Sequence, residues 1–488
     1  MSTIVRQLEP KGIWNNFADL NEVPRPSKKE GRVIQFMLDF GKALGLETFS
    51  DEVGNVIIRK PATPGMEDRK KVTLQSHLDM VHQKNADTVF DFDSEGIKMF
   101  VSGDWVKAKG TTLGADNGLG VATIMTLLQS TDIPHPFIEA LFTIDEETGM
   151  TGAMGLQAGV LQGEILLNLD TEDDDEIDIG CAGGIDVTAT RSYVEEVVND
   201  AYVGCSITVK DLNGGHSGMD IHKGLGNANK IMNRLLFNAI EGFNIQVSEI
   251  DGGSLRNAIP RESFAKIAVD KDKTKTFETT FNNWADTIKA ELAINEPDLT
   301  ITMSWIETPA KVMPKGTQDK VVKALYAAHN GVYAMSAAIS DLVETSNNIA
   351  RVIAKNGQIK IACLTRSSVN SAKMNLANAL KSAFELADCT VTFAGEYPGW
   401  NPNPDSDILR LMEGKYEALY GDKPQVVACH AGLECGILGQ NYPDMDMISF
   451  GPTIKGAHSP DERVSITSVQ KFWKFIQEIL KDIPKNPS

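Results

Sequence analysis

The sequence predicts an α/β fold, a mostly parallel sheet with helices on both faces, interrupted by an inserted α+β domain. Helix-like and strand-like segments alternate through about the first 170 residues, which is typical of a sheet covered by helices. The pattern then changes to longer strands with unevenly spaced helices. Beyond a proline-rich connector at 397–404 the alternation returns. We therefore expect a discontinuous α/β domain, residues 1–184 and 398–488, and an α+β domain over 185–397.

The elements of the first part follow from their periodicity. Apolar residues recur at the helical period over 31–44, and 119–129 follow a glycine-rich turn, so both segments are expected to be helices. Four further segments are expected to be strands. Short strands are expected at 55–59 and 71–76, and buried strands at 137–144 and 164–169.

The inserted part is expected to hold eight strands and four helices, without regular alternation. The strands are expected at 185–194, 202–210, 244–250, 261–269, 299–305, 342–353, 357–365 and 389–395, and the helices near 223–241, 274–292, 317–333 and 368–386. After the connector we expect helix 406–419, strand 425–429, helix 432–438, strand 446–450 and helix 466–482.

Composition excludes several classes of protein. Lys and Arg number 47 against 66 Asp and Glu, a net charge of −19 that argues against nucleic-acid binding and against docking on anionic lipid. We see no signal peptide and no run near the 18 or so apolar residues that span a bilayer, so we expect a cytoplasmic protein. The six cysteines are scattered and form no C-x-x-C pair, which predicts reduced, mostly buried thiols.

A histidine and an aspartate follow one expected strand. His77 and Asp79 are two residues apart, so on an extended chain both side chains point to one face. Asp79 can therefore hold one ring nitrogen of His77 and turn the other toward a metal ion. For this motif alone, a structural histidine is the alternative.

Two carboxylate motifs flank other expected elements. Asp116 stands in a glycine-rich turn before a helix, where it could ligate an ion or cap that helix, and the Lys-Ser/Thr of a phosphate loop is missing. Glu146 and Glu147 close the strand 137–144. Because adjacent side chains point in different directions, one could ligate a metal while the other polarises a water. A solvated acidic turn is the alternative.

Two further residues complete a candidate metal site. Asp170 ends the strand 164–169, and His458 lies in a Gly/Pro loop after the strand 446–450; the acidic run 172–176 is expected to be solvated surface. Such sheets bind ligands at the carboxyl ends of their strands. Two histidines and three carboxylates suit two Zn²⁺ ions with one bridging carboxylate. The set is His77, Asp116, Glu147, Asp170 and His458.

These motifs, in this order and spacing, resemble the di-zinc metallopeptidases, a family that includes peptidase T, aminoacylase, carnosinase and bacterial glutamate carboxypeptidase. The resemblance covers essentially the whole chain and is strongest toward the aminoacyl-histidine (Xaa-His) dipeptidases. The matching segments are LQSHLDMV at 74–81, GTTLGADNG at 110–118, DEETG at 145–149, NLD at 168–170 and GAHSP at 456–460.

The resemblance implies how the ligands divide. His77 and Asp170 would hold one zinc ion, Glu147 and His458 the other, and Asp116 would bridge the two. Carboxylate-rich sites accept several metals, so Mn²⁺ or Co²⁺ could replace Zn²⁺.

Catalytic residues also follow from the resemblance. Asp79 would orient His77, and Glu146 would be the general base and later the proton donor. The inserted domain would be a lid whose motif NGGHSG, residues 213–218, places His216 at the oxyanion. Without the resemblance, His216 could be a histidine in a hairpin turn. A cis peptide bond is expected between Asp116 and Asn117.

Substrate contacts are expected at four positions. Asn257 and Arg366 match family positions that bind the substrate's C-terminal carboxylate, although lid arginines are often simply solvated. His430 and Glu434 lie where a strand meets a helix, and we interpret them as supporting residues or contacts to the substrate amine.

The predicted function is metal-dependent hydrolysis of dipeptides, of the Xaa-His (carnosine-like) type with broad preference, in a homodimer formed through the lid. Two alternatives stay open. One is an N-acyl amino acid amidohydrolase, which needs no pocket for a free substrate amine. The other is a non-catalytic metal- or peptide-binding protein, which would be expected to lack Glu146 or a ligand.

Overall fold

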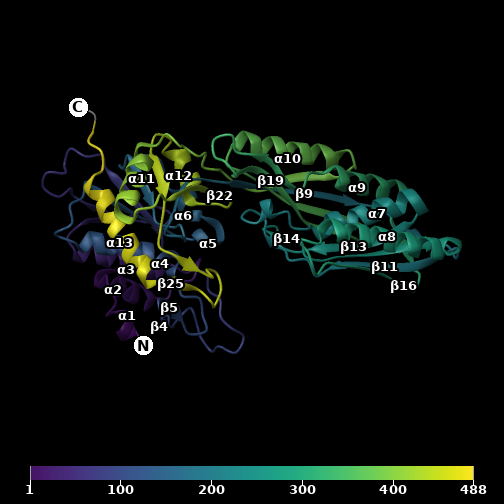
Figure 1. Ribbon diagram of the computed structural model, residues 1–488, viewed down its shortest axis with the longest axis horizontal. Coiled ribbons are helices and arrows are strands. Elements are labelled where there is room, and N and C mark those ends of the chain that lie inside the picture. The colour runs from purple at the N-terminus through teal and green to yellow at the C-terminus, as the bar shows by residue number, and fades with distance from the viewer. Residues whose placement is uncertain (1, 487–488) are drawn as a thin grey trace. The chain divides into compact units, whose positions relative to one another are not determined.

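The computed structural model describes residues 2–486 and divides the chain into two compact units, whose elements are labelled in Figure 1. Unit 1 comprises Met1–Gly180, Trp400–Ala428 and Leu433–Ser488, and unit 2 comprises Cys181–Gly399 and Cys429–Gly432. The expected boundaries lie within four residues of two of these. The short segment Cys429–Gly432 is additional to unit 2, because the Ala182 amide lies 2.9 Å from the carbonyl of Cys429 and 3.0 Å from that of Ala431.

Unit 1 is built on an eight-stranded sheet of order β1-β2-β6-β3-β7-β23-β8-β22. The strands are β1 (Glu47–Ser50), β2 (Val56–Lys60), β3 (Val72–His77), β6 (Ile138–Thr143), β7 (Ile165–Asn168), β8 (Glu176–Cys181), β22 (Gln425–Cys429) and β23 (Asp446–Ser449). Neighbouring strands within β6-β3-β7-β23 are parallel, whereas β1, β2 and β8 pair antiparallel. The predicted α/β class is confirmed, with the parallel pairs β6-β3, β3-β7 and β7-β23 at the centre of the sheet.

Helices cover both faces of this sheet. Every residue of β3, β6 and β7 is buried, which requires cover on the two faces to which alternate side chains point. The helices are α1 (Ser2–Val5), α2 (Lys11–Asn21), α3 (Gly31–Ala43), α4 (Ala115–Gln129), α5 (Glu146–Gly149), α6 (Thr151–Gly155), α11 (Asp407–Tyr420), α12 (Glu434–Asn441) and α13 (Ile466–Lys481). A smaller sheet joins β4 (Met99–Ser102), β5 (Trp105–Ala108), β25 (Arg463–Ser465) and β24 (Ile454–Lys455).

Unit 2 is an antiparallel sheet with four long helices. Its strands are β9 (Gly183–Ser192), β11 (Tyr202–Lys210), β13 (Gln246–Gly253), β15 (Ser263–Asp270), β16 (Thr300–Ile306), β18 (Gly331–Met335), β19 (Val343–Lys355), β20 (Gln358–Ser367) and β21 (Thr390–Tyr397). The helices are α7 (Ala228–Phe243), α8 (Thr274–Leu292), α9 (Lys315–Ala327) and α10 (Asn370–Glu385). Two short ribbons pair β10 (Glu196–Val197) with β17 (Lys311–Val312) and β12 (Gly215–His216) with β14 (Ala258–Ile259).

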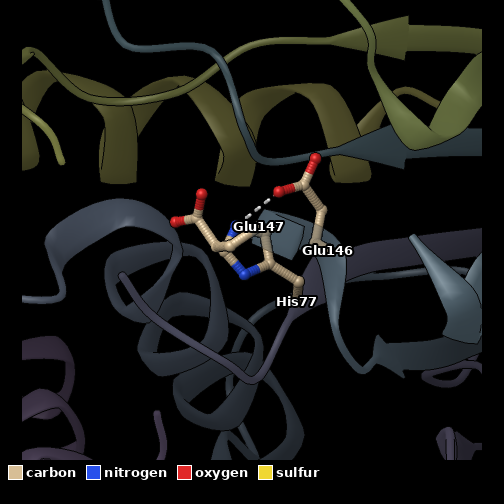
Figure 2. Close-up of side chains that lie close together, drawn as sticks. All are labelled: His77, Glu146 and Glu147. Atoms are coloured by element: carbon tan, nitrogen blue, oxygen red, sulfur yellow. Dashed lines mark ion pairs between the residues drawn. The ribbon is translucent and has the colours of Figure 1, made fainter. Parts of the chain in front are cut away.

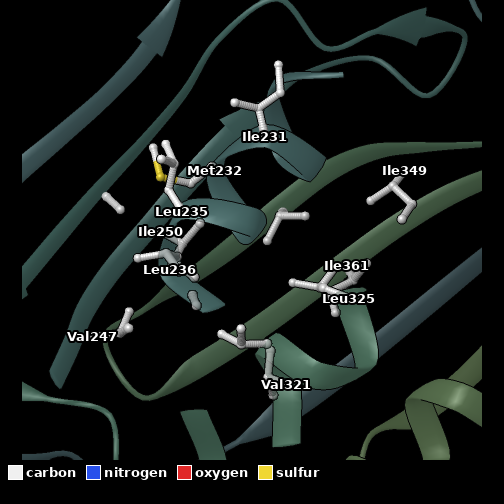
Figure 3. Close-up of a cluster of buried hydrophobic side chains, with 14 of the residues drawn as sticks. Ile231, Met232, Leu235, Leu236, Val247, Ile250, Val321, Leu325, Ile349 and Ile361 are labelled. Atoms are coloured by element: carbon white, nitrogen blue, oxygen red, sulfur yellow. The ribbon is translucent and has the colours of Figure 1, made fainter. Parts of the chain in front are cut away.

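The core of unit 2 lies between one face of the sheet and these helices. Leu235 and Leu236 of α7 and Val321 of α9 pack with Ile250 and Ile361 of the sheet (Figure 3). Burial alternates along β11 and β15, so the other face of these strands is more open. This pattern is the expected α+β arrangement.

One expected helix ends early. We predicted a helix over 317–333, but α9 ends at Ala327 and β18 begins at Gly331. Gly331 has φ of 96°, which a side-chain-bearing residue rarely adopts, so the Asn330-Gly331 pair turns the chain into a strand. Within residues 2–486 no helix combines the length and apolar character needed to cross a membrane.

Candidate metal centre

Strand ends and one loop of unit 1 carry the predicted ligands. His77 is the last residue of β3, and Asp170 follows β7 by two residues. Glu147 lies in α5, which starts just after β6. Because β3 runs parallel to both β6 and β7, the carboxyl ends of these strands meet at one edge of the sheet. Asp116 stands near the start of α4, and His458 lies in the turn between β24 and β25.

The five predicted ligands form two groups that share Asp116. In the first, Nε2 of His77 lies 3.2 Å from Oδ1 of Asp116 and 3.4 Å from Oδ1 of Asp170. In the second, Nε2 of His458 lies 3.2 Å from Oδ2 of Asp116 and 3.0 Å from Oε2 of Glu147. Each group keeps its ligand atoms within 4.8 Å of one another. The two oxygens of Asp116 therefore face two different groups, the arrangement of a bridging carboxylate.

These separations fit the donors of a zinc ion. Two ligand atoms at 2.0–2.2 Å from a tetrahedral zinc lie about 3.3 Å apart, close to the distances found here. Glu147 gives an independent indication, because its Oε1 is buried and has no hydrogen-bond partner. A buried carboxylate oxygen without a donor is unfavourable unless a cation or proton occupies that position.

Asp79 lies behind His77, as predicted. Its Oδ1 is 3.4 Å from Nδ1 of His77 and also accepts the amide of Glu146 at 3.0 Å. Its Oδ2 accepts the hydroxyl of Ser27 at 2.8 Å. Burial raises the pKa of Asp79, but the hydrogen bonds from His77 and Ser27 outweigh burial, so the net pKa is lowered. Asp79 is thus held as a carboxylate that fixes both His77 and the start of α5.

Glu146 and Glu147 diverge from the start of α5. In the view of Figure 2 their carboxylates lie on either side of the His77 ring, and Oε2 of Glu146 is 4.0 Å from Nε2 of His77. The pKa of Glu146 is raised well above 4.5, first by burial and then by the nearby carboxylates of Asp170 and Glu147, while His77 opposes the shift. A carboxyl with a raised pKa can take up and release a proton near neutral pH.

The peptide bond between Asp116 and Asn117 is cis, as expected. The Asn117 side chain donates to the carbonyl of Leu169 at 2.6 Å and also to Oδ1 of Asp170. Asn117 thus connects the Asp116 turn to the end of β7.

The acidic run after Asp170 differs from expectation. We predicted solvated surface over 172–176, but most of this run is partly buried. Burial, together with the carboxylate of Asp116, raises the pKa of Glu172 to about 8. Asp174 pairs with Lys471 at 2.6 Å. Antiparallel pairing of β8 onto β23 places the run against the rest of unit 1 instead of in solvent.

Glu434 and His430 lie in different units. Glu434 has no exposed surface, and its Oε2 accepts from Gln75 Nε2 and Thr143 Oγ1, both at 2.6 Å. Burial raises the pKa of Glu434 to about 8. Its Oε1 has no hydrogen-bond partner. Its contact with a substrate amine stays a prediction.

His430 directly follows β22 and precedes α12, where a strand meets a helix. The structure groups it with unit 2, where its Nε2 lies 2.8 Å from Oγ of Ser346. Burial, together with the positive charge of Arg366, lowers the pKa of His430 to about 3. His430 is therefore a neutral, buried imidazole.

This buried histidine predicts acid sensitivity of folding. Below the ordinary pKa of 6.5 the unfolded chain binds a proton that folded His430 excludes, so stability falls as pH falls from 6.5 toward 3. From pH 7 to 5 the loss is about 2 kcal/mol. Urea unfolding at both pH values should show a smaller loss, by about this amount, for His430→Gln.

The exposed His82 of unit 1 offers a control for that measurement. His82→Gln should keep the wild-type difference between the two pH values. If His430→Gln loses as much stability as the wild type, His430 does not cause the acid sensitivity.

His216 is held in one tautomer. It pairs with Ala258 across the β12–β14 ribbon, and its Nδ1 accepts the amides of Gly218 at 3.2 Å and Met219 at 3.1 Å. A nitrogen that accepts two N–H groups carries no proton, so the proton resides on Nε2. This tautomer makes Nε2 a hydrogen-bond donor, as contact with an oxyanion requires.

Arg366 is buried, with 4% of its surface exposed, and lies on β20. Its Nη1 donates to the hydroxyl of Tyr397 at 2.8 Å, while its Nε has no hydrogen-bond partner. A buried guanidinium with an unused donor fits an anionic ligand. Asn257 is exposed, and its carbonyl accepts the amide of Ser217, the neighbour of His216, at 2.8 Å.

Several residues near these sites escaped sequence analysis. Ser27 and Tyr397 touch predicted residues directly, and Arg25 and Glu462 hold the turn that carries Asp116. Two signals could have indicated them. Arg25 stands between two prolines in a segment with no other expected role, and Glu462 follows His458 by four residues.

Sequence comparisons extend over nearly the whole chain. The sequence model of peptidase family M20/M25/M40 matches residues 73–482. A cytosol non-specific dipeptidase of Escherichia coli (strain K12) is 43% identical over 478 residues, which are 98% of this chain and 99% of the relative.

Solved structures agree with this match. The crystal structure of aminoacylhistidine dipeptidase from Vibrio alginolyticus is 43% identical, covers 100% of both chains and superposes with a TM-score of 0.93. An aminopeptidase PepT from Bacillus cereus, at 16% identity and a TM-score of 0.57, covers 98% of this chain and 99% of its own. This second likeness concerns the fold alone.

Proposed function

The chain belongs to peptidase family M20/M25/M40, whose members are hydrolases acting on peptide bonds, and on this premise we propose that it is a dipeptidase that uses two divalent metal ions. Dipeptides of the Xaa-His type, with broad preference, are the proposed substrates. The names of the two relatives at 43% identity, a non-specific dipeptidase and an aminoacylhistidine dipeptidase, support this choice.

One observation carries the proposal: the two oxygens of Asp116 face two separate groups of ligands. His77 and Asp170 would complete one site, and Glu147 and His458 the other. Histidine nitrogens with carboxylates suit Zn²⁺, and Mn²⁺ or Co²⁺ can occupy sites of this kind. When bound, such ions polarise the scissile carbonyl and lower the pKa of a shared water.

Glu146 would move the proton. Its raised pKa and its position 4.0 Å from His77, beside but outside the two ligand groups, support a role as the base that takes a proton from the attacking water. The same carboxyl would then deliver that proton to the leaving amine. Asp79, whose two oxygens accept the Glu146 and Glu147 amides, would keep both side chains in register with His77.

Unit 2 would supply the groups that recognise charge on the substrate. The Nε2–H of His216 would donate to the oxyanion of the tetrahedral intermediate. Arg366, with its unused Nε donor, would bind the C-terminal carboxylate together with Asn257. His430 would support this set as a neutral imidazole behind Arg366, and Glu434 would serve the substrate amine.

Location and assembly are part of the same proposal. We propose that the enzyme acts in the cytoplasm as a homodimer formed through unit 2, with neither nucleic acid nor membrane as a partner. The name of the E. coli relative, a cytosol dipeptidase, supports the cytoplasmic location. The net charge of −19 supports the absence of nucleic-acid and membrane partners.

A substrate panel tests the function. Protein reconstituted with Zn²⁺ should hydrolyse β-Ala-His and Gly-His, should leave N-acetyl amino acids nearly untouched, and should carry two ions per chain by metal analysis of the same sample. Gly-His-amide should be a far poorer substrate than Gly-His, because it lacks the carboxylate expected at Arg366.

Other outcomes separate the alternatives. Preferential hydrolysis of N-acetyl amino acids would identify an amidohydrolase. A protein that holds zinc but hydrolyses nothing on the panel would be a binding protein.

A further inference from the structure

The Glu462 carboxylate binds the backbone of the turn that ends at Asp116. The side chain is buried, with 2% of its surface exposed, and accepts four consecutive backbone amides. Its Oε2 accepts from Leu113 at 2.6 Å and Gly114 at 2.9 Å. Its Oε1 accepts from Ala115 at 2.7 Å and Asp116 at 3.2 Å. One carboxylate thus fixes the backbone of the turn up to Asp116 itself.

Arg25 holds the same turn through its carbonyl groups. Its guanidinium is buried, with 1% exposed, and its Nη2 donates to the carbonyl of Gly114 at 2.6 Å. Its Nη1 donates to the carbonyls of Leu78 at 3.0 Å and Asp79 at 3.2 Å. Arg25 therefore joins the turn that carries Asp116 to the segment that follows His77.

The turn is tightly packed at Gly114. Gly114 has φ of 69°, and a Cβ atom added there would lie 2.5 Å from Nη2 of Arg25 and 2.8 Å from Sδ of Met80. The peptide at Gly114 is held from both sides, with its amide on Glu462 and its carbonyl on Arg25. Neither side chain can shift without moving this peptide.

Burying two charged side chains to stabilise a turn is unfavourable in free energy. A buried carboxylate or guanidinium loses its hydration, and well-packed apolar residues often stabilise a fold equally well or better. Within the described residues, Arg25 makes no ion pair within 4.0 Å, so its hydrogen bonds go to peptide carbonyls and to Asn21, while the carboxylate of Glu462 acts on its charge from a longer distance. The feature that needs such exact placement is Asp116, whose oxygens must face two groups at once.

We propose that Glu462 and Arg25 are positioning residues that set the Asp116 carboxylate for simultaneous contact with both metal ions. The inference rests on the proposed two-metal function. Glu462 also follows the ligand His458 by four residues, so it ties the Asp116 turn to the loop of the second site. Loss of the hydrogen bonds of Glu462 and Arg25 should first weaken the site formed by Glu147 and His458. The His458 side chain is 57% exposed, whereas that of His77 is 1% exposed.

Glu462→Gln is the sharpest test. The substitution keeps size but leaves one acceptor oxygen and turns an NH₂ group toward two backbone donors. The matched control is Glu139→Gln, another fully buried carboxylate of unit 1 that accepts hydrogen bonds through both oxygens, from Arg59 Nε and from the amide of Gln162. Glu139 lies near the start of β6, away from the strand ends that carry the ligands.

The readouts are zinc bound per chain at buffered free zinc, and thermal unfolding with and without zinc. Glu462→Gln should bind the second ion roughly 10- to 100-fold more weakly and gain less stability from zinc. Glu139→Gln should lose stability but keep the wild-type zinc affinity. Wild-type zinc affinity in a folded Glu462→Gln protein would overturn the inference.

If Glu462→Gln does not fold, Arg25→Lys takes its place, since an ammonium keeps the charge but lacks the fork that reaches three carbonyls. Weakened binding of the second ion would support the inference, and unchanged zinc affinity would overturn it. Should the wild type itself bind fewer than two ions, the proposed function fails instead, and the two failures are thereby distinguished.

Discussion

Glu146→Gln is expected to lower kcat by roughly 10²- to 10⁴-fold, the contribution of a positioned general base, while zinc content stays at the wild-type value. The glutamine keeps the size of the side chain and cannot take a proton. Zinc should stay because Glu146 lies outside both groups of ligands that share Asp116. Kinetics with β-Ala-His and metal analysis of the same preparation check both parts of the prediction.

The pH profile gives a second readout for Glu146. A base must be deprotonated to act, so wild-type activity should fall as pH falls through the pKa of Glu146, which burial raises. This limb should disappear from the residual activity of Glu146→Gln. Glu139→Gln removes a buried carboxylate near the start of β6, the strand that precedes α5, and should keep the limb. Full activity of Glu146→Gln with zinc bound would exclude the base assignment.

Much of the fold was predictable because the relevant signals are local. The strands at 72–77 and 138–143 lie where strands were predicted, and α8 over 274–292 matches its predicted range. Short elements of the smaller sheet, such as β4, were missed because four residues carry too little periodicity. The helix α2 was missed although it buries Trp14 and Phe17.

The site divides in the same way. His77 and Glu147 could be proposed from sequence because the end of a strand is a local feature, and the structure brings them together with Asp116. Glu462 and Arg25 were missed, because their hydrogen bonds join residues 25, 114 and 462 and exist only once the chain is folded, so the sequence signals at these two residues did not reveal their role. The assignment of His430 to unit 2 has a related cause: the four-residue segment Cys429–Gly432 lies inside a stretch of unit 1 and belongs to unit 2.

Asp116→Asn should produce the second large effect, the loss of both metal ions. The amide of asparagine keeps one oxygen and presents an NH₂ group to the other group of ligands. One uncharged oxygen ligand therefore replaces the two carboxylate oxygens of Asp116. Metal-ion catalysis supplies several kcal/mol, so activity should fall by roughly 10³-fold or more. Zinc titration at buffered free zinc should show that both ions bind more weakly.

His458→Asn distinguishes a bridge from an ordinary ligand. His458 belongs to one group only, so its loss should weaken one ion and spare the ion held by His77 and Asp170. Asp104→Asn is the control. Asp104 lies in the turn between β4 and β5, outside both groups of ligands, and accepts hydrogen bonds from Ser465 and Thr467. The Asp104→Asn variant should bind two ions per chain. If Asp116→Asn also lost only one ion, Asp116 would be a ligand of a single site and the second ion would need another bridge.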